Sequence, residues 1–224
     1  MGGTLMLYIM KLTPKTKLLM IGDSITDVGR ARPVGEGRND ELGKGYVAIV
    51  DAMLNALYPD AAIRTINMGT SGNTVRDLKD RWKTDVLDLN PDWLSIMIGI
   101  NDVWRQFDSP KQSERHVHAE EYESTLRELT TKTRPSLKGM VLMTPFYIEP
   151  NAADPMRAKM DHYGSIVKKI AAEADAIFVD TQAAFNAALK YQYAGNLAWD
   201  RVHPGMTGHM ILALAFLRGI GVAV

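Results

Sequence analysis

The sequence predicts an α/β fold, a three-layer α/β/α sandwich around a five-stranded parallel sheet. Short apolar runs of strand length alternate along the chain with longer stretches of helical period, and the short runs are apolar almost without interruption. Strands with this continuous apolar character are buried on both faces, as in parallel sheets covered by helices. The chain has 224 residues, 46% of them hydrophobic and 23% charged, which is close to the average for globular proteins.

Five short runs rich in Leu, Ile, Val and Met are the candidate strands. Joined by right-handed crossovers, they form a doubly wound sheet, and such sheets bind ligands at the carboxyl ends of their strands. The candidate strands are residues 17–21, 63–68, 93–98, 139–144 and 176–179.

Six longer segments between and after these runs have helical period. The clearest is the segment 156–174, in which Met160, Ile166 and Ile170 share one apolar stripe and Lys168 and Lys169 lie on the far side. The predicted helices are residues 46–57, 74–89, 119–133, 156–174, 181–191 and 207–217. The segments 29–45 and 144–155 are rich in Gly or Pro and follow strand ends, so we expect these loops to wall a site.

We expect one domain over residues 1–224, with residues 1–15 as an unstructured or edge-docked leader. The chain contains no internal repeat, low-complexity tract or linker. The order of apolar and charged residues in the leader does not fit a signal peptide, and no apolar stretch approaches the roughly 18 residues of a membrane span. These observations predict a soluble, cytoplasmic protein with no membrane partner.

Charge and composition exclude several classes of function. The 26 Lys and Arg residues balance 26 Asp and Glu residues, so the chain lacks the basic character of a nucleic-acid binder. The absence of cysteine excludes disulfide scaffolds, thiolate nucleophiles and cysteine-ligated metals. His116 and His118 open a predicted helix without the usual zinc spacing, so we expect no metal site.

Ser24 directly follows the first strand, in Gly22-Asp23-Ser24. Gly22 permits a sharp turn at the edge of the sheet, which places the serine hydroxyl at the start of the next segment. A serine in this position is either an ordinary helix N-cap or a nucleophile. The Gly-x-Ser-x-Gly elbow of common α/β-hydrolases is absent from the chain, which disfavours that family.

Asp200 and His203 lie three positions apart near the end of the chain. One turn lets the carboxylate accept the Nδ1 proton of His203 and leaves Nε2 free as a base. Pro204 keeps His203 out of helical geometry, because the residue before a proline favours extended backbone. The alternative is a surface ion pair of little energetic weight.

Two further strand ends offer hydrogen-bond donors for an oxyanion. The glycines around Gly72 let backbone N–H groups approach a ligand closely, and Asn101 offers a side-chain amide after the third strand. Each of these features alone is typical of an ordinary turn. Together with the serine and the late histidine, they predict an acyl-transfer site at one edge of the sheet.

In this combination the sequence resembles the GDSL esterases in their SGNH hydrolase branch, named for the catalytic Ser, Gly, Asn and His. The four matching blocks occur in order and are Gly22-Asp23-Ser24, Gly72, Gly99-x-Asn101-Asp102 and Asp200-x-x-His203. The resemblance begins near residue 17, covers nearly the full chain and implies a flavodoxin-like sandwich. The residues around 22–33, 104–105 and 198–204 resemble the bacterial intracellular acetyl xylan esterases.

The resemblance implies a role for each matched residue. Ser24 is then the nucleophile, His203 the general base and acid, and Asp200 the residue that orients the imidazole. The backbone N–H groups of Ser24 and Gly72 and the side chain of Asn101 form the oxyanion hole. The resemblance also implies removal of acetyl groups from xylo-oligosaccharides, no cofactor, and homo-oligomers up to octamers.

Three residues are candidates for substrate binding: Asp23, beside the serine, and Trp104 and Trp199, which flank the matched blocks. The two indoles either stack on a sugar ring or pack in the core. The aromatic run 191–193 is a candidate contact for self-association. The alternatives are a lysophospholipase, thioesterase or general short-chain carboxylesterase with the same site, a metal-dependent deacetylase, and a carbohydrate-binding module without activity.

Overall fold

The computed structural model describes residues 10–224. Residues 1–9, the larger part of the predicted leader, lie outside the described residues. The remainder of the leader is docked on the body of the protein. Leu12 is buried, the Lys11 backbone N–H donates to the Ile220 carbonyl at 2.8 Å, and the Lys15 N–H donates to the Ala61 carbonyl at 2.7 Å.

The core of the fold is a five-stranded parallel sheet with the strand order β2-β1-β3-β4-β5, so the predicted α/β fold is confirmed. This is the flavodoxin-like order, in which the chain starts inside the sheet and changes direction between β1 and β3. The strands are β1 Lys17–Gly22, β2 Arg64–Gly69, β3 Trp93–Met97, β4 Gly139–Met143 and β5 Ile177–Val179.

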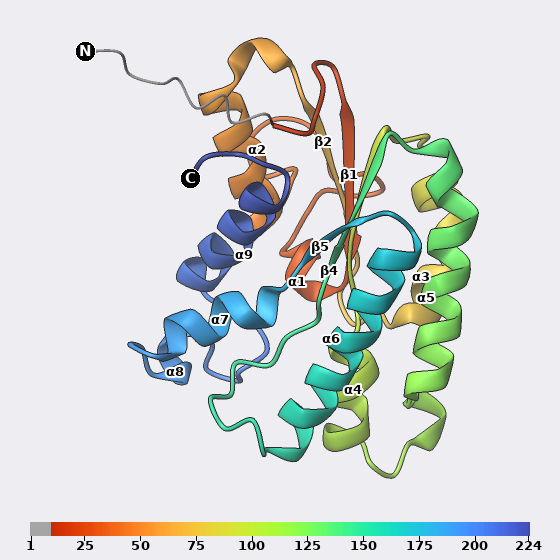
Figure 1. The fold of residues 1–224 in the computed structure, drawn as a ribbon, viewed down its shortest axis with the longest axis vertical. Coiled ribbons are helices and arrows are strands. Elements are labelled where there is room, and N and C mark those ends of the chain that lie inside the picture. Colours follow the sequence, from red (N-terminus) through yellow and green to blue (C-terminus); the bar gives the residue numbers. More distant parts are fainter. Residues whose placement is uncertain (1–9) are drawn as a thin grey trace.

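Helices cover both faces of the sheet (Figure 1). On one face α2 packs against α9, and α9 against α7; on the other, α5 packs against α3 and α6, and α6 against α4. Their bounds are α1 Ser24–Asp27, α2 Tyr46–Leu57, α3 Val75–Trp82, α4 Ile100–Asp108, α5 Ala119–Thr133, α6 Pro155–Glu173, α7 Thr181–Leu189, α8 Ala194–Leu197 and α9 Met206–Gly219. Three-residue 3₁₀ turns are η1 Pro59–Ala61, η3 Ser113–Arg115 and η4 Arg134–Ser136.

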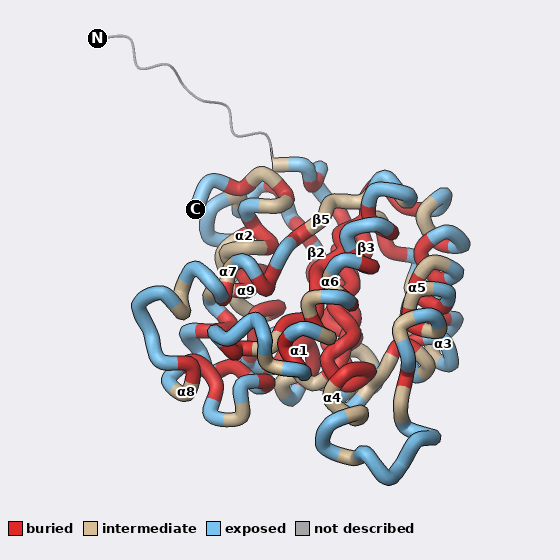
Figure 2. Tube along the Cα trace, turned by 60° about the horizontal axis from the view of Figure 1, so that its bottom comes forward, coloured by how far each residue is buried: buried red, intermediate tan, exposed pale blue. Residues whose placement is uncertain are grey.

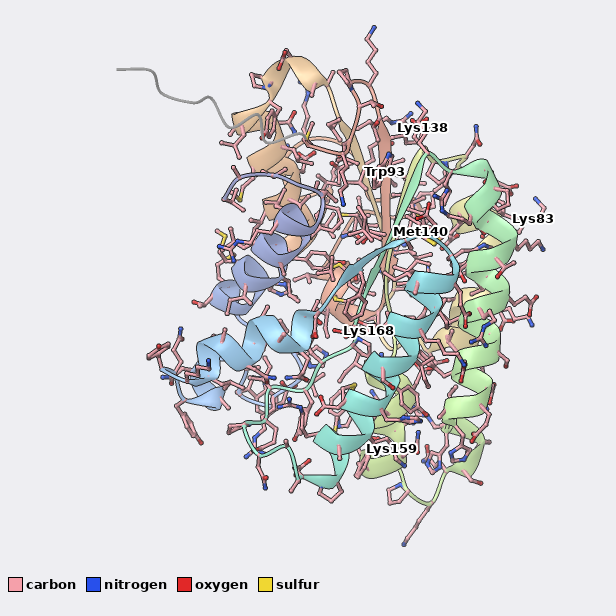
Figure 3. The ribbon with its side chains drawn as sticks, viewed as in Figure 1. Lys83, Trp93, Lys138, Met140, Lys159 and Lys168 are labelled. Carbon is pink, nitrogen blue, oxygen red and sulfur yellow. The ribbon has the colours of Figure 1, made fainter. Side chains whose placement is uncertain are left out.

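The sheet is buried because both of its faces are covered. Every residue of β3 and β4 is buried, and the buried trace runs from the strands into α1 and α4 (Figure 2). Trp93 and Met140 lie within this interior, on neighbouring strands, whereas Lys159 and Lys168 mark the outer layer along α6 (Figure 3). The carboxyl ends of the strands, where α1 and α4 begin, are therefore held by a rigid core.

The prediction of one regular helix over residues 74–89 is wrong. It divides into α3 and a π-helical segment, η2 Lys83–Leu87. The buried residues Leu78, Trp82 and Val86 are spaced four apart. A π turn holds more residues than an α turn, so it keeps Val86 on the same buried face as the two residues before it.

The helix α9 supplies a hydrogen-bond acceptor to the start of α2. Gly45, the N-cap of α2, has no side chain to accept the first free backbone N–H groups. His209 of α9, which is 5% exposed, takes this role, because its Nδ1 accepts the Tyr46 N–H at 3.3 Å. This bond joins the last helix to the first long one.

Candidate active site

Four segments bring their polar residues together at the carboxyl edge of the sheet. β1 ends in Gly22 and leads directly to Ser24, while the turn that contains Gly72 follows β2. Asn101 lies in the first turn of α4, directly after β3, and the loop between α8 and α9 carries His203. All four segments contain a residue that the sequence singled out.

Ser24 is not the N-cap of α1. Asp23 is the N-cap, and its Oδ1 accepts the Ile25 backbone N–H at 3.0 Å. The hydroxyl of Ser24 is therefore free for another partner, and it lies 3.0 Å from Nε2 of His203. The geometry favours the nucleophile over the helix cap.

Asp200 holds His203 through both of its carboxylate oxygens. Oδ2 lies 2.6 Å from Nδ1 of His203, while Oδ1 accepts the backbone N–H groups of Val202 at 2.9 Å and His203 at 2.8 Å. Burial raises the pKa of the Asp200 carboxyl, but the hydrogen bonds from the His203 side chain and from the two backbone groups outweigh it, and the pKa lies below its ordinary value. A carboxylate that stays charged fixes the imidazole with Nε2 toward the serine.

The turn that carries the histidine is pinned to the loop after β4. Arg201 has a φ of +63°, a left-handed conformation that is unfavourable for a residue with a side chain. Its carbonyl accepts the Ile148 N–H at 2.9 Å, and its guanidinium pairs with the buried Glu149. The surrounding loop thus stabilises the strained turn between Asp200 and His203.

Three donors are available for an oxyanion beside Ser24. Within residues 10–224, no hydrogen bond is donated by the backbone N–H of Ser24 or of Gly72. Gly72 has a φ of +82°, which glycine adopts without strain. The third donor is the side-chain amide of Asn101, which is 2% exposed.

The Asn101 amide is oriented from both ends. Its Nδ2 donates to the Asn73 carbonyl at 2.9 Å, and its Oδ1 accepts from Arg105 Nη2 at 3.1 Å. A guanidinium can only donate and a carbonyl can only accept, so these two partners exclude the flipped amide. One hydrogen of Nδ2 remains for a ligand.

Two residues that the sequence analysis missed support the turn at Gly72. Arg81 of α3 donates to the Gly22 carbonyl at 2.9 Å, to the Met68 carbonyl at 2.7 Å and to Asn73 Oδ1 at 2.6 Å. It thereby ties the ends of β1 and β2 to the loop of the oxyanion donors. Asp27 of α1 accepts the backbone N–H and the hydroxyl of Ser71, both at 3.0 Å.

Two buried carboxyl groups, Asp23 and Asp102, directly neighbour Ser24 and Asn101 in the sequence. Burial raises the pKa of Asp23 to about 7, against the opposing effects of the Ile25 N–H and of the charges of His203 and Arg81. Burial likewise raises the pKa of Asp102 to about 7. Asp102 Oδ1 accepts the Val75 N–H at 3.0 Å, and its Oδ2 has no hydrogen-bond partner among the described residues. Asp23, predicted to bind substrate, is 1% exposed and caps α1.

The two candidate tryptophans differ in their surroundings. Trp104 is half-buried, its ring centroid lies 5.7 Å from that of His203, and the guanidinium carbon of Arg105 lies 4.6 Å from its ring. Trp199 is 86% exposed, on the loop before Asp200. Of the two indoles, Trp104 is the one placed against the imidazole.

Among residues 10–224, no three His, Asp or Glu side chains gather in a way that would hold a metal ion. In the same part of the chain, no helix combines the length and the apolar character needed to cross a membrane.

Comparison with known proteins identifies the family. The family model described as the GDSL-like Lipase/Acylhydrolase family matches residues 20–211. The chain belongs to the GDSL-like lipase/acylhydrolase family. The resemblance noted from the four sequence blocks is thereby confirmed.

Relatives within the GDSL-like family cover almost the whole chain. A curated acetylxylan esterase from Geobacillus stearothermophilus is 63% identical over 212 residues, which are 95% of this chain and 97% of the relative. The crystal structure of Axe2, an acetylxylan esterase from the same organism, matches with a TM-score of 0.95 and 62% identity over 96% of this chain and 98% of the other. Catalytic mutants of Axe2 with a serine, an aspartate or a histidine replaced by alanine have also been solved.

A further solved structure comes from an environmental sample. LAE5, an alpha/beta hydrolase enzyme from the metagenome of Lake Arreo in Spain, matches with a TM-score of 0.94 and 50% identity. The match covers 95% of this chain and 98% of the other.

Proposed function

We propose that this protein is a serine esterase that removes acetyl groups from acetylated xylo-oligosaccharides through an acyl-enzyme. The observation that carries the chemistry is the continuous hydrogen-bond chain from Asp200 through His203 to Ser24. The substrate class rests on the 63% identity to an acetylxylan esterase. Every group that the reaction uses, from nucleophile to oxyanion donors, belongs to the chain itself.

The first half of the reaction transfers the acetyl group to Ser24. His203 Nε2 takes the hydroxyl proton as Oγ attacks the ester carbonyl, because serine is a weak nucleophile until a base accepts its proton. The carbonyl oxygen becomes an oxyanion, which the N–H groups of Ser24 and Gly72 and the Asn101 amide stabilise. The bond to the sugar oxygen then breaks, the sugar takes the proton from Nε2, and acetyl-Ser24 remains.

The second half of the reaction repeats these steps with water. His203 Nε2 takes a proton from a water molecule as its oxygen attacks the acetyl carbon, and the same three donors stabilise the oxyanion. The bond to Ser24 Oγ breaks, Oγ takes the proton back, and acetate leaves. Throughout, the charged Asp200 stabilises the imidazolium that forms twice in each cycle.

The test of this proposal measures acetate release over a panel of acetylated sugars and alkyl esters of increasing chain length, for the wild type and for Ser24→Ala. We expect turnover to be highest on acetylated xylo-oligosaccharides and to fall by a factor of roughly 10³ or more in Ser24→Ala, because the attacking atom is gone. Ser124→Ala, which removes an exposed hydroxyl of α5 that donates to the Glu121 carbonyl, is the matched control.

Three outcomes of this panel, extended to thioesters, would contradict the proposal, and so would one outcome of an EDTA treatment. A Ser24→Ala protein that keeps more than a few per cent of wild-type kcat would exclude the serine mechanism. A preference for long acyl chains or thioesters would favour the lysophospholipase or thioesterase alternative, and a lack of turnover on all esters would favour the carbohydrate-binding module. Inhibition by EDTA that added metal reverses would favour a metal-dependent deacetylase.

We also propose that the protein forms a homo-oligomer, up to an octamer. Besides further copies of itself, its partner is a neutral acylated carbohydrate, and it uses no cofactor. Support comes from three exposed aromatic residues that flank α8 in the sequence, named here the exposed aromatic patch around α8: Tyr191, Tyr193 and Trp199, which are 89%, 75% and 86% exposed. Large exposed apolar side chains that cluster are typical of protein contacts. The cytoplasmic location stays a prediction, which fractionation of the source cells tests.

A further inference from the structure

A groove leads away from the catalytic histidine between α4 and the start of α6. It has a volume of about 330 Å³, within the roughly 300–1,000 Å³ of small-molecule sites. We propose that this α4–α6 groove binds the xylose rings next to the acetylated one, an inference that rests on the proposed function. Its lining includes Trp104, Phe107, Asp108, Tyr147, Asp154 and Met156.

The groove begins at the catalytic centre because Trp104 belongs to both. The indole and the His203 ring meet at an interplanar angle of 65° with their centroids 5.7 Å apart, and the same indole lines the groove. Phe107 and Asp108 follow one turn further along α4, at its carboxyl end. A sugar whose acetyl group lies at Ser24 therefore has its neighbouring rings directed past Trp104 into the groove.

The lining has the chemistry that sugar rings need. A xylose ring has apolar C–H faces, which pack on aromatic side chains, and hydroxyl groups at its rim, which need hydrogen-bond partners. Phe107 is 37% exposed although it is large and apolar. Phe107 is not part of the buried hydrophobic core of the described residues, so its ring is open to a ligand at this end of α4.

Two carboxylates lie beside the aromatic wall. Asp154 uses Oδ1 to cap α6, where it accepts the N–H groups of Met156 and Arg157 at 3.0 Å, and Asp108 uses Oδ2 to pair with Arg105. Among the described residues, the other oxygen of each carboxylate accepts no hydrogen bond. These two oxygens can accept hydrogen bonds from sugar hydroxyls without disturbing the cap or the ion pair.

The aromatic wall is held in place before any ligand arrives. The Arg105 guanidinium lies over the Trp104 ring at 4.6 Å, and the Lys159 ammonium, at the α4 end of α6 in Figure 3, lies 5.5 Å from the Phe107 ring. Side chains that are already ordered lose less conformational entropy on binding. A hollow of similar volume, about 320 Å³, lies between α6 and α7, but Trp104, the residue that connects the α4–α6 groove to His203, does not line it.

The test compares two acetate esters in Phe107→Ala and in a matched control. Acetylated xylotriose fills the groove, whereas ethyl acetate has no ring to place there. We expect Phe107→Ala to lower the ratio of kcat/KM for acetylated xylotriose to kcat/KM for ethyl acetate by about five- to tenfold. Most of this change should appear as a higher KM for the sugar, and Phe107→Tyr, which keeps the ring, should restore the ratio.

Leu87→Ala is the matched control, because Leu87 is 36% exposed and lies near the opposite end of the sheet, before β3. It should leave the ratio unchanged. An unchanged ratio in Phe107→Ala, or an equal loss in Phe107→Tyr, would overturn the groove proposal while leaving the esterase intact. A wild type that hydrolyses ethyl acetate and not acetylated xylotriose would instead refute the proposed substrate class, and the groove assignment with it.

Discussion

The oxygen and nitrogen of the Asn101 side-chain amide could exchange places without changing the shape of the side chain. Only one of the two arrangements offers a hydrogen-bond donor to an oxyanion. Arg105 on one side and the Asn73 carbonyl on the other leave only one orientation in which both partners are satisfied. The proposed oxyanion donor is thus oriented by a residue one helical turn away and by the loop that follows another strand.

We predict that Asn101→Ala lowers kcat by roughly 10²–10³ and changes KM little, because the amide donates to the oxyanion as its charge develops. Steady-state kinetics together with a melting curve check this. Asn55→Ala, which removes an exposed helical amide bonded to the Asp51 carbonyl, is the control. A raised KM and a lowered Tm with kcat near wild type would show that Asn101 only ties down its loop.

The residues proposed to carry the chemistry can be predicted from the sequence, whereas the residues that hold them in position cannot. Ser24, Gly72 and Asn101 follow three strands, and Asp200 and His203 form a local spacing, so both signals are visible in the chain. Arg81 contacts the carbonyl of Gly22, 59 positions away. A contact with a distant backbone atom leaves no pattern in the sequence, because any residue supplies that carbonyl.

At the scale of elements, the strands are predictable to within one residue at each end. Their apolar runs are continuous because helices cover both faces of the sheet. The helix α4 was missed because it follows Gly99, which has a φ of +128°, and because its first turn contains Asn101 and Asp102, which read as a turn.

The contact between α9 and α2 makes stability sensitive to acid. Burial, and to a lesser extent the nearby His203, lower the pKa of His209 from 6.5 to about 4. The stability from neutral His209 is therefore complete above pH 6.5 and is lost as the pH falls from 6.5 through 4. At about 1.4 kcal/mol for each pH unit, this corresponds to about 3 kcal/mol.

We predict that His209→Gln loses less stability than the wild type between pH 7.5 and pH 4.5, because an amide oxygen accepts the Tyr46 N–H at both pH values. Melting temperatures of the two proteins at both pH values measure the difference. His162→Gln, a change of the exposed histidine on α6, is the control. Equal losses in His209→Gln and the wild type would mean that other groups cause the acid sensitivity.

At the scale of the whole molecule, the exposed aromatic patch around α8 lies on the segment that leads to Asp200 and His203. Self-association through this patch would therefore cover surface close to the turn between Asp200 and His203.

We predict that light scattering at micromolar concentration gives the mass of an oligomer, a whole-number multiple, greater than one, of the 24.9 kDa of one chain. Replacing Tyr191 and Tyr193 by Ser should shift the mass toward that of one chain, because the contact loses its apolar area. The control replaces Leu57, an exposed residue at the end of α2, by Ser. A wild-type mass of about 25 kDa would refute self-association.

The hydrogen bond between Ser24 and His203 joins residues that are 179 positions apart. A partly formed molecule that already has β1 and its neighbouring strands contains the proposed nucleophile and oxyanion donors, yet it lacks the proposed base. Esterase activity is therefore an assay of completed folding: during refolding it returns only after the last loop and α9 have docked, however early the sheet has formed.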